Sequence, residues 1–341
     1  MALASDKPDF VPFPALIADI GGTNARFGLM TDALSALKQF PVVKTNDFAD
    51  LMHAMQETAL NHTAIQPRAA ILAVAGPVRG DVISLTNSSW IVEPKRLIEE
   101  FGFEIVVVLN DFEALALSLP SMADADLEPI GDGLHNQHGT KLVVGPGTGL
   151  GAAALVSARD SWVPLPGEGG HINFGPVTDL DFDIWRVMEP TNGRITAETF
   201  LSGPGIMRLY KALSVLGQKQ PSFSRAADVT RAALDNSDTI ARETLDLFCS
   251  YLGRFAGDMA MFTMAKGGVY LAGGIAPRIA PLLKTSTFRA AFDAKAPHDD
   301  LLGKIPTSIV THPNPALHGL ATYARTPPRF AIELRGRRWT A

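Results

Sequence analysis

Short apolar runs alternate with helical patterns over the first third of the chain. Continuous or alternating apolar residues predict strands, whereas apolar residues spaced three and four apart predict helices. The strands expected on this basis are residues 15–20, 26–30, 39–43, 68–74, 81–85 and 104–109, and the helices are residues 47–60, 94–101 and 112–118. Three strands followed by alternating helices and strands predict an α/β domain.

The same design begins again near the middle of the chain. Residues 141–144 and 152–156 are apolar runs on either side of a glycine-rich turn, as are residues 15–20 and 26–30 at the start. Residues 120–137 are acidic, contain proline and glycine, and have no clear period, so we predict that they connect two domains. The expected organisation is two similar halves, each beginning on a glycine turn of the size that suits a phosphate group.

The longest helical pattern covers residues 237–265. Its apolar stripe consists of Leu245, Phe248, Cys249, Leu252, Phe255, Met259 and Phe262. We expect Asn236 or Ser237 to cap its start, Gly267 and Gly268 to end it, and Cys249 to be a core residue rather than a reactive thiol. The elements expected after it are a strand at 268–271, a glycine turn at 273–274, helices from 275 to 283 and over 317–324, and a loosely held tail beyond 327.

Composition and charge narrow the class of protein. The chain has 341 residues, of which 46% are hydrophobic and 19% charged, and this length suits two folded domains. Its net charge of −5 argues against nucleic-acid or anionic-membrane partners, and the short basic stretch at residues 335–338 does not change this. We therefore expect no nucleic-acid partner and no membrane partner.

The single cysteine, Cys249, excludes an intramolecular disulfide and a multi-cysteine zinc site. The first 14 residues lack the basic start and apolar core of a signal peptide, and no apolar run reaches the length of a membrane span. The sequence thus predicts a cytoplasmic protein.

The first glycine turn offers groups that suit a phosphate. Its backbone and side-chain donors are Gly21, Gly22, Thr23 and Asn24. Glycine lets main-chain N–H groups approach a ligand closely, and Asp19 at the end of the preceding strand could hold Mg²⁺ directly or through water. A hairpin turn with an incidental acid is an equally good interpretation of this stretch alone.

Two further stretches carry candidate chemistry. Asn110 and Asp111 end a strand at the edge where open α/β sheets bind ligands, so Asp111 is a candidate general base, although an aspartate that caps the next helix explains this position slightly better. Glu168 and His171 stand among glycines and suit the hydroxyl groups of a sugar, but a solvated loop is an equal alternative. Taken alone, Glu198 is typical of a helix surface.

The second glycine turn, residues 145–151, satisfies G-x-G-x-x-A through Gly147, Gly149 and Ala152. The residues that follow predict a strand rather than the helix of a dinucleotide-binding fold, so this match is weak. The chain contains no Walker A sequence, and any ATP would bind to glycine-turn hairpins instead.

Taken together, these stretches resemble the motif series of the bacterial glucokinase family. The matching segments, in that family's order, are residues 19–24, 109–113, 145–151, 166–171, 201–205 and 271–275. Each motif alone is weak, but six in order over residues 16 to about 325 are specific.

This resemblance implies the actin-like ATPase fold, with two ribonuclease-H-like α/β domains flanking a central cleft. It implies a small domain of residues 1–118 plus about 318–341 and a large domain of residues 119–317. The implied ligands are ATP, Mg²⁺ and a sugar, and a homodimer is usual in the family. The implied phosphate loops are residues 19–24 and 145–149, with the adenosine turn at Gly273 and Gly274. Asp111 would be the base, and the sugar would be bound by Asn110, Asp111, Glu168, His171 and Glu198.

The function implied by the resemblance is transfer of the γ-phosphoryl group of ATP to the 6-hydroxyl of glucose, the first step of glycolysis. The alternatives are a kinase of another hexose such as mannose or fructose, a sugar-sensing regulator without turnover, and a chaperone-type or acetate-kinase-type member of the same superfamily. The related repressor and open-reading-frame kinase group often carries a cysteine-rich zinc motif, which a single cysteine cannot provide.

Overall fold

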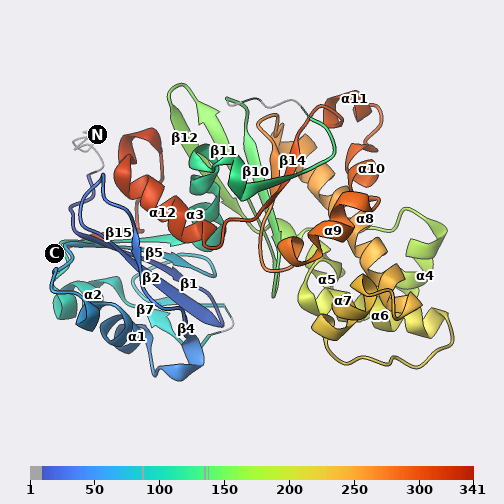
Figure 1. Ribbon diagram of the computed structural model, residues 1–341, viewed down its shortest axis with the longest axis horizontal. Helices are drawn as coiled ribbons and strands as arrows, with labels where there is room; N and C mark the ends of the chain where they lie inside the picture. The colour runs from blue at the N-terminus through green and yellow to red at the C-terminus, as the bar shows by residue number, and fades with distance from the viewer. Residues whose placement is uncertain (1–9, 87, 134–135, 137) are drawn as a thin grey trace. The chain divides into compact units, whose positions relative to one another are not determined.

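The computed structural model describes residues 10–86, 88–133, 136 and 138–341. The chain divides into two compact units, which are described one at a time below (Figure 1). The first unit comprises Met1–Met122, Leu155–Pro166 and Pro313–Ala341, and the second comprises Ala123–Ala154 and Gly167–His312. The domain boundaries expected at residues 118 and 317 stay a prediction, and the expectation about the N-terminus concerns mainly residues 1–9, outside the described part.

The first unit is built on a mixed sheet in the order β15-β8-β5-β1-β2-β3, with β4 also paired to β2. Its strands are β1 (Ala15–Ile20), β2 (Asn24–Met30), β3 (Lys38–Gln39), β4 (Val43–Lys44), β5 (Ala69–Val74), β8 (Ile105–Asn110) and β15 (Arg338–Thr340). β1 and β2 form an antiparallel hairpin, whereas β1, β5 and β8 run parallel to one another. The central strands are apolar on both faces because both faces are covered.

Helices cover the two faces of this sheet. α1 (Leu51–Thr58) and α2 (Pro94–Phe101) lie on one face, and α3 (Asp111–Ser118) and α12 (Pro315–Arg325) lie on the other (Figure 1). Alternate residues of β1, such as Leu16 and Ala18, share a core cluster with Leu51 and Met55 of α1. The strand period of two thus divides the apolar residues of β1 between two helical layers.

The second sheet repeats this arrangement, in the order β12-β11-β10-β13-β14-β9. Its strands are β9 (Leu127–Ile130), β10 (Lys141–Pro146), β11 (Leu150–Ala158), β12 (Ser161–Gly167), β13 (Val269–Leu271) and β14 (Thr307–Val310). The end of β11 and nearly all of β12 are grouped with the first unit, and the other strands belong to the second. Three consecutive strands lie side by side, and β13 and β14 follow in parallel on the other side of β10, as β5 and β8 follow β1. The predicted repeat of two similar halves is confirmed.

The helices of the second unit surround α8 (Thr239–Thr263), whose buried residues include Phe248, Cys249 and Phe255. The other helices are α4 (Asp179–Val187), α5 (Ala197–Phe200), α6 (Gly203–Leu216), α7 (Ala226–Leu234), α9 (Ala280–Thr285), α10 (Phe288–Asp293) and α11 (Asp299–Leu302). The expectation that Cys249 is a core residue is confirmed. The expected apolar stripe is wrong at its end, because Phe262 is 84% exposed.

Several expected boundaries are wrong for local reasons. Helix α8 is capped by Asp238, whose side chain accepts a hydrogen bond from Ala241 N, and not by its two neighbours. It ends at Met264 in a left-handed conformation rather than at the later glycines. Helix α1 begins at Leu51 because Asp50 caps it by accepting from His53 N. Two short strands, β3 and β4, replace the single strand expected at residues 39–43. The strand expected at residues 81–85 contains β6 (Ile83–Ser84), which pairs with β7 (Ile91–Val92), a strand that the sequence did not predict.

Two segments expected to be irregular form strands at sheet edges. The predicted connection at residues 120–137 contains β9, which pairs antiparallel with β14; residues 134, 135 and 137 lie outside the described part. The tail expected to be loosely held contains β15, which pairs antiparallel with β8 and buries Trp339. Both strands are short, and neither shows an apolar run that marks it in the sequence.

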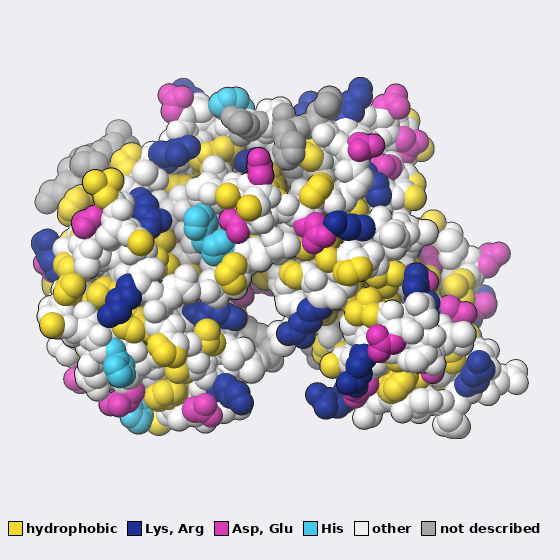
Figure 2. Space-filling model, viewed as in Figure 1, with side chains coloured by type: hydrophobic (Ala, Val, Ile, Leu, Met, Phe, Trp, Pro, Cys, Tyr) yellow, Lys and Arg dark blue, Asp and Glu magenta, His cyan; other side chains and the backbone are white. Residues whose placement is uncertain are grey.

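Acidic and basic side chains are mixed over the face drawn in Figure 2 rather than gathered by sign. Within the described part of the chain, no helix is both long and apolar enough to span a membrane.

Candidate functional site

The first glycine turn joins β1 to β2 in the first unit. Gly21 N donates to Asn24 O at 3.0 Å, which closes the turn. Thr45 braces it by donating its backbone N–H to Thr23 O at 3.0 Å and its hydroxyl to Gly22 O at 2.9 Å. The Thr23 side chain is exposed at the tip of the turn.

Asp19 lies near the end of β1, two residues before Gly21. Its Oδ2 atom accepts from Arg26 Nη1 at 3.2 Å, and 16% of its side chain is exposed. Burial raises the pKa of the Asp19 carboxyl, and the Arg26 guanidinium opposes that shift. The arginine contact engages a single carboxylate oxygen.

Asn110 and Asp111 stand where β8 ends and α3 begins. Asn110 Oδ1 accepts from the backbone N–H groups of Phe112 at 3.0 Å and Glu113 at 3.2 Å, so Asn110 is the helix cap. Asn110 Nδ2 donates to Gly76 O at 3.3 Å. The interpretation of Asp111 as the cap is therefore wrong, because Asp111 is the first helical residue and its side chain is half-buried.

The parallel register brings Asp19 and Asn110 to the same edge of the sheet. Asp19 is aligned with Ala73 of β5, and Ala73 is aligned with Leu109 of β8. Two strand spacings correspond to about 10 Å, so the carboxylate of Asp19 and the start of α3 lie at one edge of the first unit. This is the carboxyl edge of its parallel strands, where such sheets bind ligands.

The second glycine turn joins β10 to β11 in the second unit. Gly145 is buried within β10, so the turn itself consists of Gly147, Thr148 and Gly149, with Thr148 exposed. Gly147 N donates to Gly149 O at 2.8 Å, and Gly147 O accepts from Gly203 N at the start of α6 at 2.8 Å. The turn is therefore held by the first residue of a helix.

Gly273 and Gly274 lie directly against this second turn. Gly273 has a φ of +76°, and a Cβ atom there would stand 2.6 Å from Pro146 O, so only glycine fits. Ile275 N donates to Pro146 O at 3.2 Å. Both glycines are exposed, so their backbone forms a surface beside the turn.

The loop with Glu168 and His171 packs on the same hairpin through its glycines. A Cβ atom at Gly170 would stand 2.1 Å from Leu150 O, which excludes any side chain there. The Glu168 and His171 side chains are more than half exposed, with 3.9 Å between Glu168 Oε2 and His171 Nε2. The glycines thus fix the loop while both polar side chains face solvent.

Glu198 is tied to the second glycine turn and is not an ordinary helix-surface acid. Its Oε2 atom accepts from Leu150 N at 2.8 Å, and a Cβ atom at Gly149 would stand 2.5 Å from the same oxygen. Glu198 lies in the four-residue helix α5. Thr196 caps the start of this helix, and its backbone N–H donates to Thr199 Oγ1 at 3.0 Å.

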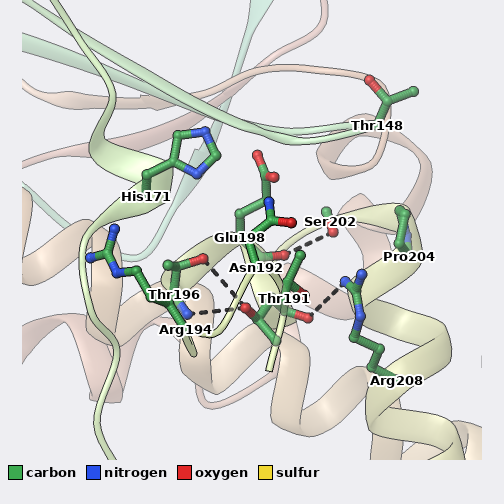
Figure 3. A pocket seen from close by; sticks show the side chains of 11 residues that line it. Thr148, His171, Thr191, Asn192, Arg194, Thr196, Glu198, Ser202, Pro204 and Arg208 are labelled. Carbon is green, nitrogen blue, oxygen red and sulfur yellow. Dashed lines mark hydrogen bonds between the residues drawn. The ribbon is translucent and has the colours of Figure 1, made fainter. Parts of the chain in front are cut away.

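A pocket of about 170 Å³ in the second unit, lined mainly by residues with polar side chains, brings several of these residues together. In Figure 3 the Glu198 carboxylate stands between His171 and Thr148. The lining residues are Thr148, His171, Thr191, Asn192, Arg194, Thr196, Glu198, Thr199, Ser202, Pro204 and Arg208. Glu168 lies on the same loop as His171 but does not line the pocket.

Sequence reasoning missed Asn192, Arg194 and Arg208. Thr191 and Arg194 exchange backbone hydrogen bonds of 2.9 and 3.1 Å across a two-residue turn with positive φ at both central residues. Asn192-Gly193 is the dipeptide most typical of such a turn, so this hairpin carried a readable signal. Arg208 of α6 donates from Nη1 to Thr199 O at 3.3 Å, and no pattern in the sequence marks it.

Comparison with known proteins agrees with this geometry. The sequence model of the glucokinase family, described as "Glucokinase", matches residues 16–327. A glucokinase of Rhizobium etli is 53% identical over 329 residues, or 96% of each chain, and one of Chelativorans sp. is 50% identical over 339 residues, or 99% of each chain. The crystal structure of a glucokinase from an Antarctic psychrotroph, 34% identical, superposes with a TM-score of 0.82 over 92% of this chain and 100% of that one.

The two like sheets, each with a glycine turn in its first hairpin, have the actin-like ATPase fold. Family model, full-length relatives and structural neighbour agree over the same residues. This chain belongs to the glucokinase family.

Proposed function

We propose that this protein is an ATP-dependent glucokinase, which transfers the γ-phosphoryl group of ATP to the 6-hydroxyl of glucose to give glucose 6-phosphate and ADP. The observation that carries the proposal is the bond from Leu150 N to Glu198, since it joins a carboxylate of a polar pocket to a phosphate-sized glycine turn. Relatives that are about half identical over nearly their whole length are named glucokinase.

The sugar-binding residues in this proposal are Glu198, His171, Glu168, Asn110 and Asp111. Carboxylates accept from sugar hydroxyls, whereas the imidazole and the amide both donate and accept. A site that pairs each hydroxyl rejects a sugar in which one is missing or points in another direction, because a polar group of the site is then left without a partner. This is the physical basis for choosing glucose among hexoses.

The nucleotide is bound by the two glycine turns and by Gly273-Gly274. The N–H groups of Gly21 and Gly147 close the two turns. The backbone N–H groups of Gly22 and Gly149 suit phosphate oxygens, with the exposed hydroxyls of Thr23 and Thr148 beside them. The open surface of Gly273 and Gly274 suits the flat adenine ring of adenosine, because neither glycine carries a side chain. Phosphoryl transfer then depends on positioning and on neutralising the phosphate charge.

Mg²⁺ fits the acid at the end of β1. The ion usually keeps several waters and binds through one or two carboxylates and the substrate phosphates, so a dedicated cluster of ligands is not required. Among the described residues, no group of three or more candidate ligands occurs. Asp19 would hold the ion through water, since Arg26 engages only Oδ2, and the bound ion would neutralise phosphate charge.

Asp111 is the general base that accepts the proton of the 6-hydroxyl. It is half-buried in the first turn of α3, at the carboxyl edge of the parallel strands, and a carboxylate there can accept a proton from a hydroxyl group. Asn110 supports it by capping that helix.

We also propose that the enzyme acts in the cytoplasm as a homodimer. Both points rest on the resemblance to the family. Light scattering at assay concentration tests the dimer: a mass of about two chains of 36.4 kDa is expected, and a single-chain mass contradicts it.

A coupled assay tests the proposed reaction. ATP and Mg²⁺ are supplied with glucose, mannose, fructose or N-acetylglucosamine, and wild type is compared with Asp111→Ala and with Glu100→Ala, an exposed acid of the same unit. We expect turnover on glucose, and a loss of kcat on the order of 10²-fold or more in Asp111→Ala alone.

Preference for mannose or fructose would assign another hexose. Glucose binding without turnover on any sugar would indicate a sensor. Wild-type turnover of folded Asp111→Ala would contradict the assignment of the base.

A further inference from the structure

The C-terminal tail places a cation inside the first unit, beside the start of α3. Arg337 Nη1 donates to Glu113 Oε2 at 2.6 Å, and the exposed fractions of the two side chains are 15% and 0%. Glu113 is the third residue of α3 and lies two residues after Asp111. Arg337 lies beyond residue 327, where the match to the family sequence model ends.

Glu113 belongs to the first turn of α3, which Asn110 caps. The backbone N–H of Glu113 donates to Asn110 Oδ1 at 3.2 Å, and that of Phe112 donates to the same oxygen at 3.0 Å. Asp111 lies between Asn110 and Phe112 in this turn. Whatever holds the Glu113 carboxylate therefore holds the turn of helix that carries Asp111.

The tail holds Arg337 in place from its own side. Arg337 Nε donates to Glu333 O at 2.6 Å, and Nη2 donates to the same carbonyl. Arg337 O accepts from Val108 N of β8 at 2.9 Å, and β15 continues the pairing with Trp339 opposite Val106. The guanidinium is thus anchored to β8, the strand that ends at Asn110.

Burial of the Glu113–Arg337 ion pair has an energetic cost, which argues that the pair serves to position the helix. Glu113 Oε1 is buried without a hydrogen-bond partner among the described residues. Burial raises the pKa of the Glu113 carboxyl, and the Arg337 guanidinium opposes this. Buried ion pairs are often no more stabilising than apolar residues of the same size, so stability alone explains this one poorly.

We infer that Arg337 is a positioning residue for catalysis: by holding Glu113, the C-terminal tail fixes the first turn of α3 and the orientation of Asp111. The inference rests on the proposed function of Asp111 as the base. A reacting group displaced by about 1 Å can cost on the order of 10²-fold in rate.

The first test measures kcat and KM of the full-length enzyme with ATP and glucose. We expect Arg337→Met to lower kcat by about 10- to 100-fold while both KM values change by less than about threefold. Arg337→Lys should recover part of kcat, because it keeps the charge but loses the guanidinium that bonds to Glu113 and to Glu333 O at once. Arg335→Ala is the matched control, since this arginine of the same tail is exposed. An unchanged kcat in folded Arg337→Met would overturn the inference.

A double variant separates position from stability. Arg337→Met leaves a buried carboxylate without its partner and is expected to lower the melting temperature, or even to prevent folding. Arg337→Met/Glu113→Gln removes that charge, so we expect the melting temperature to recover while kcat stays low. Recovery of kcat together with stability would mean that the pair serves only folding, and the inference would be wrong.

The outcome for Asp111→Ala keeps the two proposals apart. Loss of turnover in Asp111→Ala with a normal Arg337→Met enzyme would contradict only the positioning role. Normal turnover in Asp111→Ala would contradict the assignment of Asp111 as the general base.

Discussion

Glu198 Oε2 accepts a hydrogen bond from the backbone N–H of Leu150 at 2.8 Å, so an acid that lines the pocket of the second unit also braces the second glycine turn. The two residues are far apart in the sequence, on α5 and at the start of β11. A change at Glu198 is therefore expected to affect both substrates of the proposed reaction.

Replacing Glu198 separates these two effects. Glu198→Gln keeps an oxygen that can accept from Leu150 N, whereas Glu198→Ala removes both this bond and the proposed sugar contact. Because charge-assisted hydrogen bonds contribute about 1.5–3 kcal/mol, we expect Glu198→Ala to raise the KM for glucose by at least about tenfold and to raise the KM for ATP as well. Glu198→Gln should change mainly the KM for glucose. Steady-state kinetics with each substrate varied in turn would measure both, and equal ATP KM values in the two variants would contradict the brace.

Gly149→Ala tests the close contact between the second glycine turn and the Glu198 carboxylate. Its Cβ atom would stand 2.5 Å from Glu198 Oε2, so the carboxylate has to move away from Leu150. We expect the KM for glucose to rise by about tenfold, with the protein still folded. Gly175→Ala is the control, because no atom lies within 4 Å of its Cβ position and its φ is not positive. Similar kinetics for the two variants would show that the contact has no role in binding.

Gly319→Ala is expected to destabilise the first unit. Helix α12 crosses α3 so closely there that a Cβ atom would stand 1.8 Å from Ala114 O. Overpacking of this kind typically costs about 1–3 kcal/mol of the free energy of unfolding. Urea denaturation would measure the loss, with Gly303→Ala as a helix-end control whose nearest atom is 3.4 Å away. A midpoint equal to that of wild type would contradict the close packing.

Alkaline pH should weaken the second unit through Cys249. Burial raises the pKa of its thiol from 9.0 to about 12, so the folded chain keeps a proton that the unfolded chain loses first. The free energy of unfolding therefore falls as the pH rises from about 9 towards 12, by at most about 1.4 kcal/mol per pH unit for this group.

Urea denaturation at pH 8, 9 and 10 would measure this dependence. Cys249→Ala should be less stable at pH 8 but lose less stability between pH 8 and pH 10 than wild type. Equal losses in the two proteins would show that the thiol is not the group responsible.

The two halves, the main strands and the glycine turns were predictable from the sequence because each is marked by a pattern of neighbouring residues. β5 is a continuous apolar run buried on both faces, and glycines mark the turns after β1 and β10. The order of the motifs indicated the family before any distance was known. Residue types and spacing are sufficient for such features, since the cause of the pattern lies within a few residues.

Only the tertiary structure decided which residues meet. Three residues of β15 pair with β8, and no periodicity in so short a segment reveals a partner elsewhere in the chain. In the same way, nothing around Glu198 points to Leu150, and nothing around Arg337 points to Glu113. Local patterns report how a segment is buried, whereas contacts between distant segments depend on register and crossing, which no single segment of the sequence contains.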